Sequence, residues 1–364
     1  MSFMKLVAKL VTLAHFSTTL AYVFTPDTDL PPVDPRLPVL YDIVKSQTFT
    51  LDNAPLITFS FTSYLTTTTG EQFFFTAAIS ASESLDTYGF SMLDLGSLER
   101  TWKASITTFT RDDLASFNIS QPNFDIAGIP PDRLSMTVQA HTENMSLDLT
   151  VHATSRAFYY GGGSGTYMFV DTPGNEWQFP AMKTSGTLSL LEPPFQTTEQ
   201  PVQRMQIDPS ASLSWYTRYW GAIDLHGGNS TSFNLLFHDT GLVLGSYFID
   251  SINPPFHSRS VDLRFRHEAA QALVPVDVFE PDMKNTWTSP RTGIVYPQRW
   301  DLGIEGRGIL HINSIVGGQE NSLEVDGTGP TVASYIGFVT FDGSFDGSEV
   351  SGFGLVQLNF PVSV

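Results

Sequence analysis

The sequence contains no cysteine and few charged residues. Asp, Glu, Lys and Arg make up only 15% of its 364 residues. Without a thiol the chain has no disulfides, no cysteine nucleophile and no Cys-based metal site. Ser, Thr, Asn and Gln must therefore supply much of the polar surface. Because 41% of the residues are hydrophobic, the chain can bury a large core, and its length favours two domains.

Positive charge is scarce as well. The chain has 19 Lys and Arg against 37 Asp and Glu, for a formal net charge of −18. Nucleic acids and anionic membranes are bound through Lys and Arg, so we expect neither as a partner. The eight His lack the four-residue spacing of a metal-binding helix, and the chain has no Walker loop, dinucleotide-binding glycine motif or nucleophile elbow. We therefore expect no metal and no cofactor.

The N-terminus is typical of a secretory signal peptide. Lys5 and Lys9 precede a mostly apolar run at residues 10–20. Residues 19–21 form a small-x-small cleavage site. The run is too short to span a bilayer, so we expect a signal peptide over 1–21 and no membrane span; the alternative is a buried amphipathic helix. Glycosylation sequons at Asn118, Asn144 and Asn229 predict a secreted protein or one in the lumen of the secretory pathway.

Alternating apolar and polar residues predict an all-β fold. Four strand pairs separated by turn residues are expected at 56–65 with 72–79, 134–141 with 147–153, 233–238 with 242–249, and 334–341 with 353–360. Helix signals are few, at 111–117 with Thr110 as N-cap and at 268–273. The glycine run 161–165 is expected to be a turn. A Pro-rich segment within 192–209 predicts a division into domains 22–205 and 206–364.

Several short motifs resemble the hydroxyneurosporene synthase-like family, which includes fungal Diels–Alderases. The resemblance lies in SWYTRYWG at 214–221, FNLLFHDTG at 233–241, WTSPRTG at 287–293, YPQRW at 296–300, WQFP at 177–180 with SGT at 185–187, and the closing YIGFV at 335–339 with VSGFG at 350–354. The family implies two lipocalin-like β-barrel or sandwich domains packed together, with a cavity near their junction. Secreted relatives include hetero-Diels–Alderases of tropolone-sesquiterpenoid biosynthesis.

One position departs from the family pattern. Where members often carry an acid in the aromatic run before Trp-Gly, this sequence has Thr217. This departure puts a hydratase-type acid at that position in doubt and favours a protein that binds and orients its substrates.

The resemblance thus implies a cofactor-independent pericyclase, catalysing a [4+2] cycloaddition of apolar terpenoid or polyketide substrates held in a cavity. The alternatives are a terpenoid or carotenoid hydratase, with His238, Asp239 or Asp224 as its acid, and a non-catalytic lipocalin-like carrier. The sequence does not indicate the oligomeric state.

Candidate site residues come from the same motifs. Arg218, His238 and Asn234 are the candidate catalytic donors, since Arg218 is costly to bury unpaired and the other two share one strand face. Arg218 has the alternative of a structural ion pair. Candidate substrate-binding walls, for which core packing is the alternative, are Trp215, Tyr219, Phe237, Trp287 and Tyr296.

Overall fold

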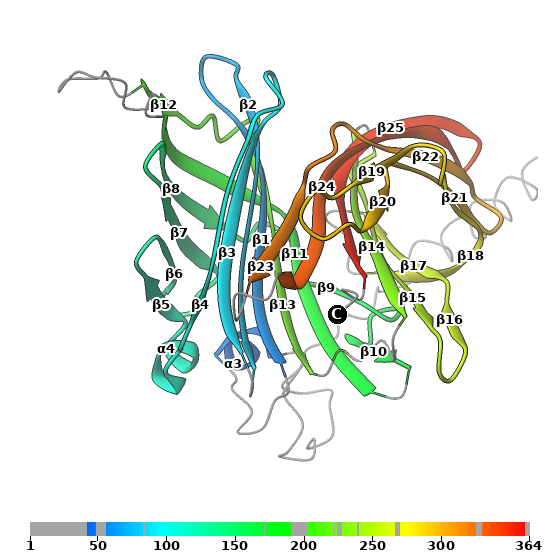
Figure 1. The fold of residues 1–364 in the computed structure, drawn as a ribbon, viewed down its shortest axis with the longest axis horizontal. Helices are drawn as coiled ribbons and strands as arrows, with labels where there is room; N and C mark the ends of the chain where they lie inside the picture. The colour runs from blue at the N-terminus through cyan, green and yellow to red at the C-terminus, as the bar shows by residue number, and fades with distance from the viewer. Residues whose placement is uncertain are drawn as a thin grey trace, which may run out of the picture.

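The protein is an assembly of antiparallel β-strands with two short helices, α3 (Ile43–Gln47) and α4 (Arg111–Ser116) (Figure 1). A computed structural model describes residues 42–48, 56–82, 85–170, 172–190, 203–221, 223, 228–238, 240–265, 270–324 and 330–360. The expected signal peptide, Asp224 and Asp239 lie outside these ranges. The all-β prediction is confirmed, and no helix of the described ranges is long and apolar enough to cross a bilayer.

The first sheet is a broad, curled layer. In spatial order its main strands are β4 (Arg100–Thr107), β3 (Asp86–Asp94), β2 (Gln72–Ser82), β1 (Leu56–Thr66), β13 (Leu213–Gly221), β11 (Thr172–Leu190), β8 (Met145–His152), β7 (Ser135–His141), β6 (Phe124–Ile129) and β5 (Asn118–Gln121). Short strands β9 (Phe158–Tyr159), β10 (Thr166–Phe169) and β12 (Gln203–Gln206) pair with β11. The curl brings Phe90 of β3 to Phe124 of β6, with ring centroids 5.9 Å apart.

The second sheet closes on itself. Its barrel strands are, in order, β14 (Asn229–Phe237), β25 (Ser348–Asn359), β24 (Pro330–Phe345), β22 (Gly308–Ser314), β21 (Arg299–Ile304), β18 (Ala272–Pro281), β17 (Ser260–Phe265) and β15 (Leu242–Ser251). Pairing of β14 with β15 completes an eight-stranded barrel. Outside that circuit lie β16 (Phe256–Ser258), β23 (Glu320–Glu324) and the ribbon of β19 (Thr286–Thr288) with β20 (Val295–Pro297).

The expected local structures are largely confirmed. All four predicted strand pairs form, as β1–β2, β7–β8, β14–β15 and β24–β25. Helix α4 has Thr110 as its N-cap, with the Asp113 N–H donating to the Thr110 hydroxyl at 3.1 Å. The glycine run is a turn between β9 and β10. The helix expected at 268–273 is wrong where the structure describes it, because Ala272 begins β18 and pairs with β17.

Strand β13 lies in the middle of the first sheet, between β1 and β11. The chain therefore changes from sheet to barrel between β13 and β14. The domain division after residue 205 stays a prediction.

Side-chain alternation gives the sheet two different faces. The concave face buries aromatic residues such as Phe59, Phe61, Trp177 and Tyr216 in one core. Helix α3 covers part of this core, where Trp177 Nε1 donates to Ser46 Oγ at 3.0 Å. The opposite face of the sheet faces the barrel.

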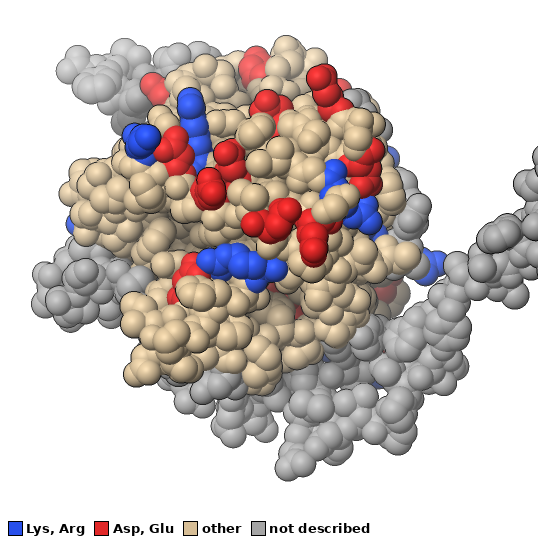
Figure 2. Space-filling view, turned by 90° about the vertical axis from the view of Figure 1, so that its right-hand side faces the viewer, with Lys and Arg blue, Asp and Glu red and all other residues tan. Residues whose placement is uncertain are grey.

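The barrel interior is filled by its own side chains. Phe233 packs against Trp300 with ring centroids 5.6 Å apart, and Phe248 packs against Phe279 at 4.5 Å. On the outer side of the barrel, Asp and Glu are spread over the surface with Lys and Arg between them, and the described residues form no continuous basic patch on this face (Figure 2).

An apolar joint holds the sheet against the barrel. Tyr64 and Phe74 of the sheet contact Phe338 of β24, with ring centroids 6.0 and 5.4 Å apart. Arg100 of β4 adds polar contacts between the sheet and the barrel, donating to the Gly318 and Glu320 carbonyl oxygens at 3.1 and 3.0 Å. Burial lowers the pKa of Arg100 to about 10, so it stays charged near neutral pH.

Candidate functional site

A cavity of about 560 Å³ lies between the sheet and the barrel. The sheet contributes short hydroxyl side chains to its wall, namely Thr58, Ser60, Thr62, Ser80 and Thr217. The outer face of the barrel contributes Ser232, Asn234, Tyr247, Leu355 and Gln357. Because these side chains are mostly small, the two faces do not fill the gap next to the apolar joint. The cavity has the size of a site for a small organic molecule.

A buried carboxyl group, Glu176 of β11, lies in the wall of this cavity. Its side chain is only 3% exposed. The Tyr167 hydroxyl donates to its Oε2 at 2.8 Å, and the Gln178 amide donates to its Oε1. Burial raises the pKa of Glu176 to about 7, and the Asp262 carboxylate also raises it, whereas the two hydrogen bonds lower it. Near neutral pH this carboxyl can therefore both donate and accept a proton.

A hydrogen bond from Trp215 fixes the orientation of the Gln178 side chain. Trp215 Nε1 donates to Gln178 Oε1 at 2.7 Å, and an indole N–H is only a donor. The amide nitrogen of Gln178 is thereby directed toward Glu176. A chain of contacts from Trp215 through Gln178 thus holds the carboxyl in place.

Four tyrosines surround the carboxyl end of the cavity. Tyr167 stacks on Tyr247 with ring centroids 5.3 Å apart, and Tyr160 and Tyr219 adjoin this pair. The Tyr160 hydroxyl donates to Asn234 Oδ1 at 2.9 Å. Burial raises the pKa of all four phenols above their ordinary value, so they are neutral at physiological pH.

Two glycines make room for these rings. A Cβ at Gly245 would lie 2.9 Å from the Tyr160 hydroxyl, and one at Gly174 would lie 2.9 Å from the Tyr219 ring. Both distances are closer than a real Cβ allows, so any larger residue would displace a tyrosine from the cavity wall.

A second buried carboxyl, Asp262 of β17, lines an adjoining cavity of about 260 Å³. Tyr160 and Tyr247 line both spaces. The backbone N–H groups of Gly161 and Gly162 donate to Asp262 at 3.0 and 2.6 Å. Burial raises the pKa of Asp262 to about 6, against the lowering by these two hydrogen bonds. Asp262 thus holds the glycine turn, and the turn positions the preceding residue, Tyr160.

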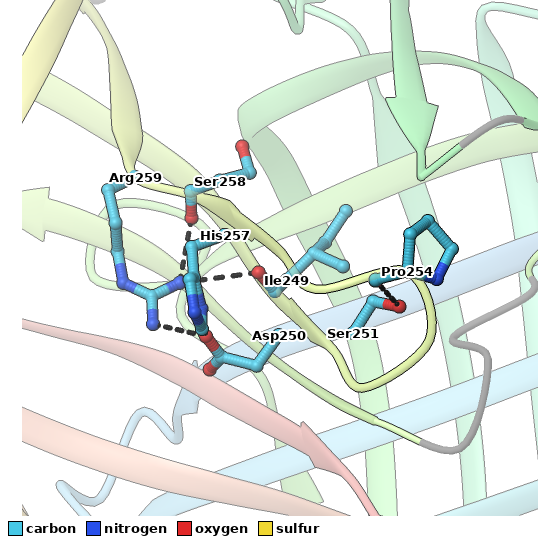
Figure 3. A network of polar contacts seen from close by, with 7 residues as sticks. All are labelled: Ile249, Asp250, Ser251, Pro254, His257, Ser258 and Arg259. Carbon is cyan, nitrogen blue, oxygen red and sulfur yellow. Dashed lines mark hydrogen bonds and ion pairs between the residues drawn. The ribbon is translucent and has the colours of Figure 1, made fainter.

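The hairpin of β15 and β16 forms the other side of this second cavity, and a polar network fixes it (Figure 3). His257 and Arg259 both point at Asp250, with His257 Nδ1 2.6 Å from Asp250 Oδ1. Arg259 also donates to the Ile249 and Ser258 carbonyl oxygens at 3.4 and 2.9 Å. The network thus ties Ile249 and Asp250 of β15, the strand that carries Tyr247, to His257 and Arg259.

Comparison with known proteins identifies relatives along nearly the whole chain. No model of a known protein family matches. Dehydratase asqC of Emericella nidulans is 30% identical over 95% of this chain and 98% of its own length. The chain belongs to the family of this dehydratase. Kievitone hydratase of Fusarium solani subsp. phaseoli is 29% identical over 88% of the chain and 86% of its own length.

Solved structures share the fold. Kievitone hydratase from Nectria haematococca superposes with a TM-score of 0.75 at 26% identity, covering 90% of this chain and 93% of that structure. A protein described as a putative AttH from Nitrosomonas europaea gives 0.70 at 17% identity, covering 92% and 100%. CghA with Sch210972 gives 0.60 at 11% identity, covering 93% and 96%. The lipocalin-like architecture is therefore confirmed, whereas the hydroxyneurosporene synthase-like name stays a prediction.

Among the sequence-predicted site residues, Asn234 and Tyr219 line the main cavity. Thr217 lines it too. In the sheet ladder Thr217 pairs with Gln178, and Tyr219 pairs with Glu176. Strand β13 has Thr217 instead of an acid on the cavity face. The neighbouring strand β11 supplies a carboxyl group, that of Glu176, to the same face.

Arg218 lies on the other face of β13, in the concave core. Its side chain is fully buried, and its guanidinium lies over the Phe59 ring at 4.3 Å and the Trp220 ring at 5.3 Å. It donates to the Tyr219 and Thr58 carbonyl oxygens at 2.6 and 3.4 Å. Burial lowers its pKa to about 10. Since it does not line the described cavities, this placement favours a structural role.

The remaining predicted residues are dispersed. His238 is exposed beside Phe353, Trp215 supports Gln178 from the joint, and Phe237 packs inside the barrel against Phe341.

The WTSPRTG and YPQRW motifs lie together beside the barrel core, where they form a hydrogen-bond network around Glu320. Trp287 stacks on Tyr296 with ring centroids 5.9 Å apart. Buried Glu320 accepts hydrogen bonds from Ser289, from Thr292 at 2.7 Å and from Tyr296 at 3.2 Å. These motifs therefore pack beside the barrel core, and neither Trp287 nor Tyr296 is among the residues that line the main cavity.

Sequence reasoning missed Glu176, Gln178, Tyr160, Tyr167 and Tyr247. One signal was present, because Glu176 directly precedes the aromatic WQFP motif, which the family resemblance places in a strand. An acid there must be either paired or functional. The tyrosines lacked a comparable signal, since their strands are distant in sequence.

The glycosylation sequons differ in accessibility. Asn118 and Asn144 are exposed, whereas Asn229 begins β14 and is half-buried.

The raised pKa of Glu176 predicts an unusual pH dependence of stability. Its folded pKa of about 7 exceeds its ordinary value of 4.5, so its contribution is fully present below pH 4.5 and is lost as the pH rises through 7. Glu176→Gln should therefore stabilise the protein at pH 8 relative to the native chain, by on the order of 2 kcal/mol. Denaturant unfolding at pH 5 and pH 8 measures this gain. An equal effect of the substitution at both pH values would contradict the raised pKa.

Proposed function

We propose that the protein is a hydro-lyase, which adds water to or removes water from a carbon–carbon double bond of a small secondary metabolite. The observation that supports this most is Glu176, a buried carboxyl in the cavity wall whose pKa lies near 7. The names of its relatives, a hydratase and a dehydratase, favour the same class of reaction. Those relatives also support a place in fungal secondary metabolism.

The chemistry needs one group that gives and takes a proton. In hydration, protonated Glu176 would transfer its proton to one alkene carbon, and water would attack the resulting cationic carbon. The attacking water then loses a proton to the Glu176 carboxylate, which restores the acid. Dehydration runs through the same steps in reverse, with Glu176 protonating the departing hydroxyl. Tyr167 and Gln178 would hold the carboxyl during both transfers.

A second candidate is the pericyclase expected from the sequence resemblance. The cavity carries neutral hydrogen-bonding groups on Asn234, Gln178 and Tyr160. Such groups stabilise a carbonyl oxygen that becomes more negative during a [4+2] cycloaddition, and the walls would hold the reacting partners together. This reaction needs no proton transfer, so Glu176 would be dispensable. A carrier would bind ligands in the same cavity without turnover.

Isotope labelling separates these candidates. The protein is incubated in ¹⁸O-labelled water with kievitone and a panel of small alkenes, and separately with the corresponding alcohols, which a dehydratase would convert to alkenes. If the protein is a hydratase, the product contains one labelled oxygen and gains the mass of one water, and Glu176→Gln prevents this incorporation. A rearranged product without solvent oxygen would favour the pericyclase and contradict the hydro-lyase. Bound but unaltered compounds across the panel would favour the carrier.

We also propose that the mature protein starts near Tyr22 and is secreted with N-glycans on Asn118 and Asn144. The signal-like N-terminus and the exposure of both asparagines support this. Intact-mass analysis of protein from a fungal host should show removal of residues 1–21 and a mass decrease after glycosidase. An unprocessed chain that the glycosidase does not shift would contradict secretion.

A further inference from the structure

The hydrogen bonds in the wall of the main cavity run in one direction, from Trp215 to Asn234. An indole N–H only donates, so Trp215 Nε1 donates to Gln178 Oε1 and leaves the Gln178 amide nitrogen as a donor. That nitrogen donates to Glu176. A second contact, from the Gln178 amide to the Tyr160 hydroxyl, opposes the rise in the pKa of Tyr160 that burial causes, an effect expected of a donated N–H. The Tyr160 hydroxyl has one proton, which it donates to Asn234 Oδ1 at 2.9 Å.

The last group of this chain keeps its donors available. With Oδ1 facing Tyr160, the Asn234 amide nitrogen carries two N–H donors, and it makes no hydrogen bond with the residues that the structure describes. Asn234 is half-buried and lines the main cavity. Its nitrogen is not among the unpartnered polar atoms of the described residues that are closed off from contact. A molecule in the cavity can therefore reach it.

The surroundings of Asn234 hold the amide in this orientation. Its partner in the ladder with β15 is Gly245, which has no side chain. The Tyr160 hydroxyl takes the space above Gly245, where a Cβ would lie only 2.9 Å from it. Asp262 holds the turn that follows Tyr160 through two backbone N–H groups. The amide is thus oriented before a ligand arrives, which lowers the entropic cost of binding an acceptor.

The same chain connects the Asn234 donor to the proposed acid. Three hydrogen bonds separate the Glu176 carboxyl from the Asn234 amide, with Gln178 and Tyr160 between them. Both ends line one cavity. A bound molecule whose reacting carbon lies at Glu176 therefore has its neighbouring atoms within reach of Asn234.

We propose that Asn234 is a specificity-determining residue, which donates a hydrogen bond to a carbonyl oxygen close to the reacting carbon of the substrate. The substrate class is then a ring compound that carries a carbonyl group, and a plain terpene hydrocarbon is a poor ligand. A hydrocarbon at this place would leave the amide donors unpaired, and sites built to form a hydrogen bond discriminate strongly against such analogues. The inference rests on the proposed function only in placing the reacting carbon at Glu176.

Three tricyclic probes that differ at one position test this without turnover. 9-Fluorenone has a carbonyl there, fluorene a methylene group and carbazole an N–H. Equilibrium dialysis against the full chain gives the ratio of fluorenone affinity to fluorene affinity. Comparing this ratio between the native chain and its variants cancels the difference in hydrophobicity between the probes. In the native protein, the infrared C=O stretch of bound fluorenone should lie below its frequency in cyclohexane, as expected of a hydrogen-bonded carbonyl.

The variants assign the hydrogen bond to Asn234. Asn234→Leu keeps a similar shape and removes both donors, so the ratio should fall about tenfold, the change typical of one hydrogen bond. Asn234→Asp keeps an acceptor for Tyr160 and replaces the donors by a second acceptor. At pH 8 it should lower the ratio at least as much and should favour carbazole over fluorene more than the native chain does. Ser232→Ala, which removes a hydroxyl from the same strand and the same cavity wall, is the control and should preserve the ratio.

Two results would overturn the role of Asn234. One is a native protein that binds no fluorenone, or binds it with the C=O stretch at its frequency in cyclohexane, and this result needs no variant. The other is an unchanged affinity ratio in folded Asn234→Leu and Asn234→Asp. Neither result bears on Glu176, and a failure to incorporate labelled oxygen would leave the change in the ratio intact.

Discussion

Replacing Glu176 by Gln should lower the turnover number about 10³-fold while leaving substrate binding nearly unchanged. The substitution keeps the size of the side chain and its contact with Tyr167, but it removes the proton that the reaction requires. General acid–base catalysis typically contributes 10²- to 10⁴-fold to a rate. Steady-state kinetics on any compound hydrated by the native chain gives kcat and KM separately.

Tyr167→Phe is the matched control for Glu176→Gln. It removes one hydrogen bond to the carboxyl at 2.8 Å but retains the acid. We expect a loss of about tenfold, with the pKa of Glu176 moving further upward because that hydrogen bond lowers it. A Glu176→Gln protein that keeps full turnover would rule out the hydro-lyase mechanism and direct attention to the neutral donors of the pericyclase.

Arg218→Ala should destabilise the protein by about 3 kcal/mol without changing the activity of the molecules that remain folded. The substitution leaves a hole against Phe59 and Trp220 and removes the donor to the Tyr219 carbonyl oxygen. Core truncations and lost charged hydrogen bonds each carry costs of this order. Thermal unfolding should show a decrease of several degrees in Tm.

Arg218→Met separates packing from charge. Methionine restores much of the lost volume and removes a buried charge, a replacement that is often neutral in protein cores. We expect its stability to lie within about 1 kcal/mol of the native chain. If folded Arg218→Met instead lost as much turnover as Glu176→Gln, Arg218 would have to act on the substrate, contrary to its position in the concave core.

Local features of the fold were predictable because adjacent residues specify them. The four strand pairs follow from alternation on both sides of a turn, and α4 follows from Thr110 and Asp113 at capping-box spacing. The helix expected at 268–273 was wrong because Ala272 and Leu273 complete a ladder with β17, and such long-range pairing overrides weak local preference.

The site was less predictable because it forms between two distant surfaces. Alternation along β13 places Trp215, Thr217 and Tyr219 on one face and Arg218 on the other. Sequence alone does not show which of these faces meets the barrel. The prediction therefore included Tyr219, which lines the cavity, together with Arg218, which does not. Glu176 and Asn234 come together only through the docking of the barrel on the sheet.

The protonation state of Glu176 is the most direct test of the proposed mechanism. Infrared difference spectra with ¹³C-labelled glutamate, recorded from pH 5 to pH 9, report the protonated carboxyl through its C=O stretch. The raised pKa predicts a carboxyl band that disappears with a midpoint near pH 7 and is missing from Glu176→Gln. A Glu176 that is fully ionised at pH 5 would contradict its role as the acid.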